Sequence, residues 1–361
     1  MSKENPRILF LARRFPPSVG GIQTTCYELY QHFQAQHDVK LIALGKNSTA
    51  HLAWFLPYAL FVSIIQVVFR RVDIVFFSDG VISVIAPILR CFTKIPFFAT
   101  IYGLEVTYSH PINSRLMKWG LACCKRIATI SQNSHKLLEG FGIPPNKIRT
   151  IYLGVEPPQI DDARRDLLKK DFEKNYHLKI GQDKILLNFG RQVPRKGIAT
   201  FIQKGMPLLD PDITFIISGR GPESEKIKQH CHDLNLGPRV RQVWLSDDDL
   251  GMLRREADLF LMPNVTYSGD AEGFGIAPLE CMFDGTPVVA FSVDALTESV
   301  RKGGYLIPPD DYQAFVDQIH TYYSLSPEER KAKQQEAQGY VHSEYTWSKT
   351  GDEYLAFFKD H

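Results

Sequence analysis

The sequence predicts an α/β protein with two Rossmann-like, doubly wound domains, each built on a parallel sheet, that face a cleft. Short apolar runs rich in Val, Ile and Phe recur along the 361 residues, separated by stretches long enough for a helix. Runs that do not alternate with polar residues are expected of parallel strands covered by helices on both faces. A chain of this length also suits two cores of roughly 150 residues better than one.

The apolar runs fall into two series of predicted strands. The first series lies at 7–12, 39–44, 73–77, 97–101, 126–130 and 148–151. A polar, charge-rich stretch at 157–181 separates it from the second series, at 185–189, 214–217, 240–244, 259–262, 288–290 and 305–307. We therefore predict domains at 1–156 and 157–344. The tail from about 345 to 361 predicts a helix whose apolar face packs back on the first domain.

The composition excludes several classes of protein. Hydrophobic residues make up 44% and aromatic residues 12%, which excludes disorder, and a net charge of +2 provides no basic field for nucleic acid. The six cysteines show no Cys-X-X-Cys pair and suit reduced thiols, and the N-terminus lacks the apolar core of a secretory signal. We predict a cytoplasmic protein with no nucleic-acid partner.

One uncharged segment, residues 52–69, bears on the cellular location. Its length reaches the lower limit for a membrane span, but Pro57, Ser63 and Gln66 interrupt it, and a single span would separate neighbouring strands. Two alternatives remain, a helix packed within the domain and a helix that contacts the inner-membrane surface. The cations that follow it, Arg70 and Arg71, favour contact with an anionic membrane near a lipid-linked substrate.

Residues 272–280 identify the chemistry best. They place Glu272 and Glu280 on either side of a turn in which Phe274 is flanked by glycines. A carboxylate accepts hydrogen bonds from hydroxyl groups, and the exposed backbone N–H groups of such a turn suit a phosphate. A ligand with sugar hydroxyls at one end and phosphate at the other is a sugar nucleotide.

In each series, the loop that follows the first predicted strand could receive the phosphates. Gly20 and Gly21 precede the first predicted helix, where backbone N–H groups and the helix dipole favour an anion. Arg191 and Lys196 lie together on the corresponding loop of the second series. A guanidinium beside an ammonium suits a diphosphate and would stabilise it as a leaving group.

Taken together, these motifs resemble the retaining glycosyltransferases of the GT-B fold, specifically the large family 4 type. The resemblance covers essentially the whole chain. It includes residues 218–222, similar to the family's Gly-x-Gly-Pro turn, and residues 285–290 after the carboxylate motif.

The resemblance implies a role for each matching residue. Glu272 would hold the hydroxyls of the transferred sugar, and Glu280 those of the ribose. Arg191 and Lys196 would bind the diphosphate. The remaining donor contacts that it implies are Gly20 and Gly21 at the diphosphate, Val243 near the base, and the N–H groups of Phe274, Gly275 and Ile276 at the sugar and phosphate.

The resemblance also implies that no metal or other cofactor is needed, because the basic pair replaces a cation. Residues 247–249, three aspartates in a row, precede an apparent helix and suit capping better than metal binding. We therefore expect no metal site, and catalytic roles for Arg191, Lys196 and Glu272.

The first half departs from the family at two places, one of which is the predicted domain hinge at 152–156. Tyr102 stands where many relatives have a histidine, with Glu105 three residues on, and both are candidates for sugar or acceptor contacts. A phenol does not act as a base near neutral pH, so a front-face displacement assisted by the leaving phosphate fits better than a histidine-dependent mechanism. His110 is a candidate substitute for the histidine.

These inferences predict a retaining hexosyltransferase that moves a hexose from a UDP- or GDP-linked donor to an acceptor hydroxyl. The acceptor would be a glycan or a lipid-linked glycan of cell-envelope polysaccharide or glycolipid synthesis. Two alternatives stay open, an enzyme similar to the sugar-nucleotide 2-epimerases and a non-enzymatic sugar-nucleotide-binding subunit.

Overall fold

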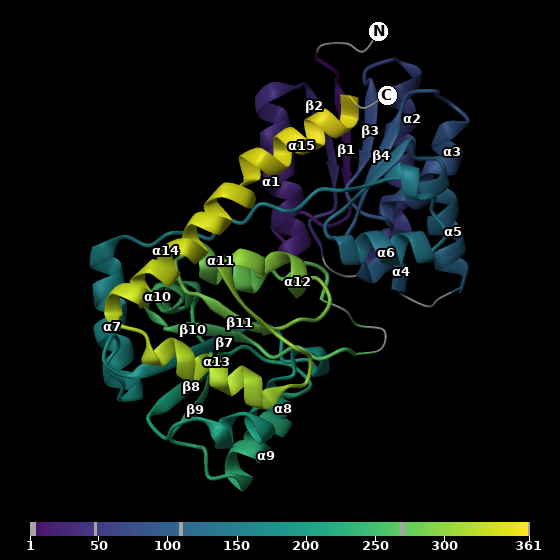
Figure 1. Ribbon diagram of the computed structural model, residues 1–361. Helices are drawn as coiled ribbons and strands as arrows, with labels where there is room; N and C mark the ends of the chain where they lie inside the picture. The colour runs from purple at the N-terminus through teal and green to yellow at the C-terminus, as the bar shows by residue number, and fades with distance from the viewer. Residues whose placement is uncertain (1–4, 47–48, 108–110, 268–269, 271, 360–361) are drawn as a thin grey trace. The chain divides into compact units, whose positions relative to one another are not determined.

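A computed structural model describes residues 5–46, 49–107, 111–267, 270 and 272–359. The chain forms two compact units, Met1–Gly154 with Tyr345–His361, and Val155–Glu344. Each unit holds a six-stranded sheet in which every strand pair is parallel (Figure 1). The predicted α/β class with two Rossmann-like sheets is confirmed. The predicted boundary after residue 156 lies two residues from the division between the units.

The sheet of the first unit has the strand order β2-β1-β3-β4-β5-β6. Leu11 of β1 lies opposite Ile42 and Phe77 on its two neighbours. The strands are β1 Ile8–Ala12, β2 Val39–Ala43, β3 Ile74–Phe77, β4 Phe97–Ile101, β5 Arg126–Thr129 and β6 Ile148–Thr150. The helices are α1 Gly21–Gln36, α2 Leu52–Val68, α3 Ala86–Arg90, α4 Leu104–Thr107, α5 Pro111–Ala122, α6 Gln132–Gly140 and α15 Trp347–Lys359, with 3-10 turns η1 Thr49–His51, η2 Ile82–Ile85 and η3 Pro145–Lys147.

Helices cover both faces of this first sheet, as its uninterrupted apolar strands require. On one face α1 and the C-terminal helix α15 pack together, and Phe358 of α15 lies 5.0 Å from the ring of Phe98 and 5.3 Å from that of Phe33. On the other face the buried side of α2, with Phe55 and Ala59, packs with α3, α5 and α6. The tail helix is thus part of the core of the first unit.

The second unit repeats the architecture, with the strand order β12-β11-β10-β7-β8-β9. Its strands are β7 Lys184–Phe189, β8 Ile213–Ser218, β9 Val240–Val243, β10 Leu259–Met262, β11 Val288–Phe291 and β12 Gly304–Ile307. Its helices are α7 Asp162–Tyr176, α8 Ile198–Lys204, α9 Ser224–Asp233, α10 Asp247–Glu256, α11 Ile276–Phe283, α12 Leu296–Ser299, α13 Tyr312–Ser324 and α14 Pro327–Glu344, with 3-10 turns η4 Pro194–Lys196, η5 Met206–Leu208 and η6 Arg301–Gly303.

The charge-rich stretch at 157–181 is more than a separator. Most of it forms α7, whose first turn is capped by the side chain of Asp161. Arg165 and Lys169 of this helix form ion pairs with Glu256 at the end of α10. Its charges therefore attach α7 to the second unit.

Candidate functional site

The basic loop after β7 is held against the segment that follows β10. The carbonyl of Arg195 accepts a hydrogen bond of 2.9 Å from the N–H of Val265. Gly197 has a φ of 66°, and a Cβ added there would lie 1.9 Å from the carbonyl oxygen of Pro263. Only glycine allows this approach, which brings the side chains of Arg195 and Lys196 to the segment after β10.

The two cations meet the buried carboxylate of Glu272, which is 8% exposed. Lys196 Nζ lies 2.7 Å from Glu272 Oε2, the Arg195 guanidinium donates to the same oxygen, and Asn264 Nδ2 donates to it at 3.2 Å. Burial alone would raise the pKa of Glu272, but the charges of Lys196 and Arg195 outweigh it and lower the pKa from 4.5 to about 2. Glu272 is a fixed anion with its charge fully compensated.

All three of these donors use one oxygen of Glu272. The structure gives no partner to Oε1 of Glu272 among the described residues, and the buried Oδ1 of Asn264 has none there either. Asn264 follows β10 by two residues and is 2% exposed. The cluster thus presents two neighbouring side chains with acceptor atoms suited to hydroxyl groups.

Two further aspartates position this cluster. Asp294 Oδ2 accepts a 3.0 Å hydrogen bond from the backbone N–H of Glu272, and Asp270 Oδ1 pairs with Arg195 Nε at 3.0 Å. Asp294, like Asn264, lies just beyond the carboxyl end of a strand, here β11. Sequence reasoning missed Arg195, Asn264 and Asp294, although their positions after strands of a parallel sheet were the available signal.

Arg191, in contrast, is not part of this cluster. Its side chain is exposed, and no hydrogen bond or ion pair to another described residue is found for it. The structure joins Lys196 to Glu272, but the arginine that accompanies it there is Arg195. The role of Arg191 at the diphosphate stays a prediction.

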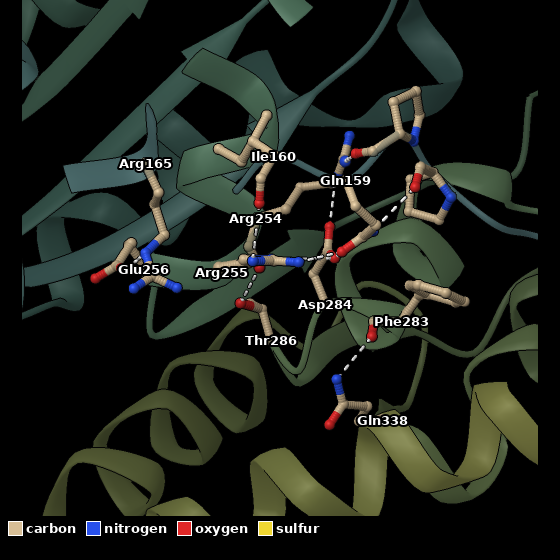
Figure 2. Close-up of polar contacts among 12 residues, drawn as sticks. Gln159, Ile160, Arg165, Arg254, Arg255, Glu256, Phe283, Asp284, Thr286 and Gln338 are labelled. Atoms are coloured by element: carbon tan, nitrogen blue, oxygen red, sulfur yellow. Dashed lines mark hydrogen bonds and ion pairs between the residues drawn. The ribbon is translucent and has the colours of Figure 1, made fainter. Parts of the chain in front are cut away.

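Glu280, on α11, has a very different setting. Figure 2 shows the polar network of Arg254, which donates to Asp284 at 2.7 Å and accepts from Thr286 through its carbonyl. Because Arg254 is committed to Asp284, it compensates Glu280 only in part. Burial first, and then the nearby charges of Asp284 and Asp247, raise the pKa of Glu280 from 4.5 to about 7. No hydrogen bond from another described residue reaches its carboxylate.

A cavity of about 490 Å³ lies at the carboxyl ends of β8 and β9. It is lined by Val243, the residue predicted to adjoin the base, and by Trp244, over whose ring the Arg220 guanidinium lies at 5.0 Å. Gly219, also in its wall, packs so closely that an added Cβ would be 2.1 Å from the carbonyl oxygen of Gly190. The cavity therefore directly adjoins the start of the basic loop.

The glycine-flanked turn of the 272–280 motif begins α11. Gly275 is the N-cap residue with a φ of 83°, and Phe274 is buried beside it. The first N–H groups of a helix, here from Ile276 onward, have no acceptor within the helix. Their predicted approach to sugar and phosphate remains a prediction.

In the first unit the predicted residues lie in two places. Gly20 and Gly21 are exposed at the start of α1. Tyr102, only 7% exposed, directs its hydroxyl to Cys26 Sγ at 3.9 Å, while its N–H donates to Glu105 Oε1 at 3.1 Å. The phenol is thus engaged inside the unit. The pKa of Glu105 is raised by burial and by the charge of Asp79. His110 lies outside the described residues.

Other predicted features have structural roles. Asp249 forms a capping box with Ser246 at the start of α10, and Asp248 pairs with Arg164 at 2.8 Å. Across the described residues, no group of three or more His, Cys, Asp or Glu is arranged to hold a metal ion. Among the described helices, none has the length and apolar character that crossing a membrane requires.

Comparisons with known proteins agree with this geometry. The family described as "Glycosyl transferases group 1" matches residues 169–339, and the family described as "Glycosyltransferase Family 4" matches residues 19–158. HepE of Anabaena, solved in complex with UDP, superposes with a TM-score of 0.78 over 98% of this chain and 100% of that chain, at 17% identity. The two units thus define a glycosyltransferase of the GT-B fold.

More specifically, the chain belongs to the glycosyltransferase family 4 type, the group 1 glycosyl transferases. An uncharacterized glycosyltransferase of Methanocaldococcus jannaschii is 24% identical over 98% of both chains. The O-antigen chain mannosyltransferase RfbU of Salmonella typhimurium is 26% identical over 58% of this chain and 54% of its own length. The resemblance predicted from the motifs is confirmed.

Proposed function

We propose that this glycosyltransferase is a retaining, metal-independent hexosyltransferase that uses a UDP- or GDP-linked sugar as donor. The observation that carries the proposal is the cluster of Glu272, Lys196 and Arg195, which places a buried cation, a half-buried cation and free hydroxyl acceptors together. The cavity at Val243 and Trp244, next to the same loop, is suited to the nucleoside.

The cluster assigns a task to each of its groups. Lys196 and Arg195 stabilise the charge that develops on the diphosphate as the bond to the sugar breaks, which is the work of a metal ion in other enzymes. Glu272, with a pKa of about 2, stays ionised and does not exchange protons at neutral pH. It holds sugar hydroxyls through Oε1, and the departing phosphate oxygen takes the proton of the acceptor on the same face of the sugar.

The acceptor is proposed to be a glycan or a lipid-linked glycan of cell-envelope polysaccharide or glycolipid synthesis. The name of RfbU, an O-antigen chain mannosyltransferase, supports this class of acceptor. We place the protein in the cytoplasm, on the inner face of the membrane, where such acceptors and nucleotide sugars meet.

The test begins with a thermal-shift panel of UDP- and GDP-linked hexoses. A donor at 100 times its dissociation constant should stabilise the protein by about 2.7 kcal/mol. The donor that binds is then incubated with envelope lipid extracts and with EDTA present throughout. We expect a product whose anomeric configuration matches the donor.

Three outcomes would contradict the proposal. Inversion of the anomeric centre or loss of activity with EDTA overturns the mechanism. Isomerisation of the donor without an acceptor would show an epimerase. Tight donor binding with no turnover of any acceptor would show a binding subunit.

A further inference from the structure

The outer side of α2 is apolar along its whole length. Trp54, Tyr58, Phe61 and Val68 recur at helical spacing and are exposed, with Phe61 at 65%, while the buried side of the helix packs on the sheet. A helix on the surface of a domain ordinarily turns a polar face to water. The outer face of α2 therefore lacks the polar residues that are expected on a helix face exposed to water.

The neighbouring helices extend this surface. The helix α3 touches α2 and α5 (Figure 1). The turn η2 packs closely on α5. Exposed large apolar side chains continue across them as Ile88 and Phe92 near α3, and as Ile112, Leu116 and Trp119 on α5, where Trp119 is 63% exposed. These five residues, together with Trp54, Tyr58, Phe61, Val68 and Phe69, form a surface that we call the outer apolar face.

The segments that carry the outer apolar face have charges of one sign. Residues 52–72, 86–97 and 111–126 contain no Asp or Glu. Arg70 and Arg71 end α2, and Arg115 and Lys118 alternate with the apolar residues of α5; all four are exposed. Arg90, although cationic, is not available, because it donates to the carbonyls of Ile95 and Cys123 at 2.8 Å.

We propose that the outer apolar face is a docking surface for an anionic lipid bilayer. Aromatic side chains and exposed cations interspersed on one surface match the interfacial region of a membrane, where rings lie at the headgroup level and cations meet anionic phosphates. The charge complementarity selects this occupant over a second copy, because two copies of the face would bring like charges together. The inference deepens the proposed function by naming the membrane-facing surface, but it does not depend on donor chemistry.

The test measures how much of the full-length chain sediments with vesicles. We expect binding to vesicles of phosphatidylcholine with phosphatidylglycerol, and much weaker binding to phosphatidylcholine alone or at high salt. Two double variants probe the face, Phe61→Ser with Trp119→Ser, and Arg70→Glu with Arg71→Glu. Each should lower the partition coefficient on anionic vesicles by at least on the order of tenfold.

A matched control changes an exposed apolar residue and an exposed cation on the second unit. Leu167→Ser with Lys170→Glu removes an exposed apolar residue and reverses an exposed cation on α7, and should leave binding unchanged. The melting temperature of each variant verifies that it is folded. If the donor did not raise that temperature, the result would concern the proposed function alone. The charge variant keeps the test decisive if the apolar one does not fold.

Several results would overturn the inference. One is wild-type protein that stays in the supernatant when mixed with anionic vesicles. Another is a pair of double variants on the outer apolar face that bind these vesicles as well as the control does. A dimer in sedimentation velocity that Phe61→Ser with Trp119→Ser disperses would make a second copy the occupant.

Discussion

Glu272 and Glu280 belong to one nine-residue motif, yet the structure puts them into opposite electrostatic surroundings. Two cations and an amide converge on Glu272, and the two cations, Lys196 and Arg195, outweigh its burial and lower its pKa to about 2. Burial next to Asp284 and Asp247 raises the pKa of Glu280 to about 7, because the nearest arginine is already paired. Residue type therefore does not determine the task of a carboxylate, whereas its neighbours do. One is a fixed charge, and the other holds a proton near neutral pH.

The largest effect is expected from removing Lys196, one of the two cations of the Glu272 cluster. Lys196→Ala should lower kcat/KM roughly a hundred- to a thousandfold, because it removes a positive charge that stabilises the leaving diphosphate. The measurement is steady-state transfer with the donor selected by the thermal-shift panel. Lys170→Ala, an exposed lysine on α7, is the control and should be near normal. Near-normal turnover of Lys196→Ala would refute the assignment.

Glu272→Gln tests the fixed charge itself. The amide leaves Lys196 and Arg195 uncompensated, so we expect a loss of about 3 kcal/mol in the free energy of unfolding at pH 7. Because the folded-state pKa lies below 4.5, this stabilisation in the wild type is present above pH 4.5 and is lost as the pH falls toward 2. Urea unfolding at pH 7 and pH 3 measures it. A variant as stable as the wild type at pH 7 would contradict the ion cluster.

Glu280→Gln should show the opposite sign. The folded state keeps a proton between pH 4.5 and about 7 that the unfolded state has lost, so wild-type stability falls as the pH rises through that window. The variant escapes this loss and should be more stable than the wild type at pH 8, by up to about 3 kcal/mol, and similar at pH 4. Equal pH profiles for the two proteins would remove the contrast with Glu272.

The same variant also tests the predicted ribose contact. With a hydroxyl acceptor weakened, the KM for the donor should rise on the order of tenfold at pH 8 while kcat changes little. With a donor whose ribose lacks the 2′-hydroxyl, the KM should be about the same for the variant and the wild type. An unchanged KM would separate Glu280 from the donor.

The smallest effect is expected from Arg195→Lys, which keeps the positive charge. Lysine cannot reproduce the guanidinium that pairs with both Asp270 and Glu272, so we expect roughly a threefold to tenfold lower kcat/KM. The loss of stability at acid pH should be the same as in the wild type. A loss as large as that of Lys196→Ala would show that geometry, rather than charge, dominates the cluster.

The fold could be predicted because strand runs such as 97–101 are read from local composition, and the structure has a strand at each predicted run. The site could be predicted only in part. Lys196 and Glu272 stand out in the sequence, but Arg195 and Arg191 are equally good candidates on one loop, and only the packing of Gly197 on Pro263 decides which reaches Glu272. Asn264 and Asp294 carry no local signal apart from their places after strands.

By itself, the sequence determined the two parallel sheets, the family and the motif that we propose binds the donor, because apolar periodicity and short motifs are local properties of the chain. The tertiary structure decided how charge is distributed within that motif. Glu272 and Glu280 acquire opposite pKa shifts from residues up to 77 positions away along the chain. It also decided that the uncharged segment is a helix with an exposed apolar face. Burial and Coulomb interactions depend on distances in space, which a linear sequence does not contain.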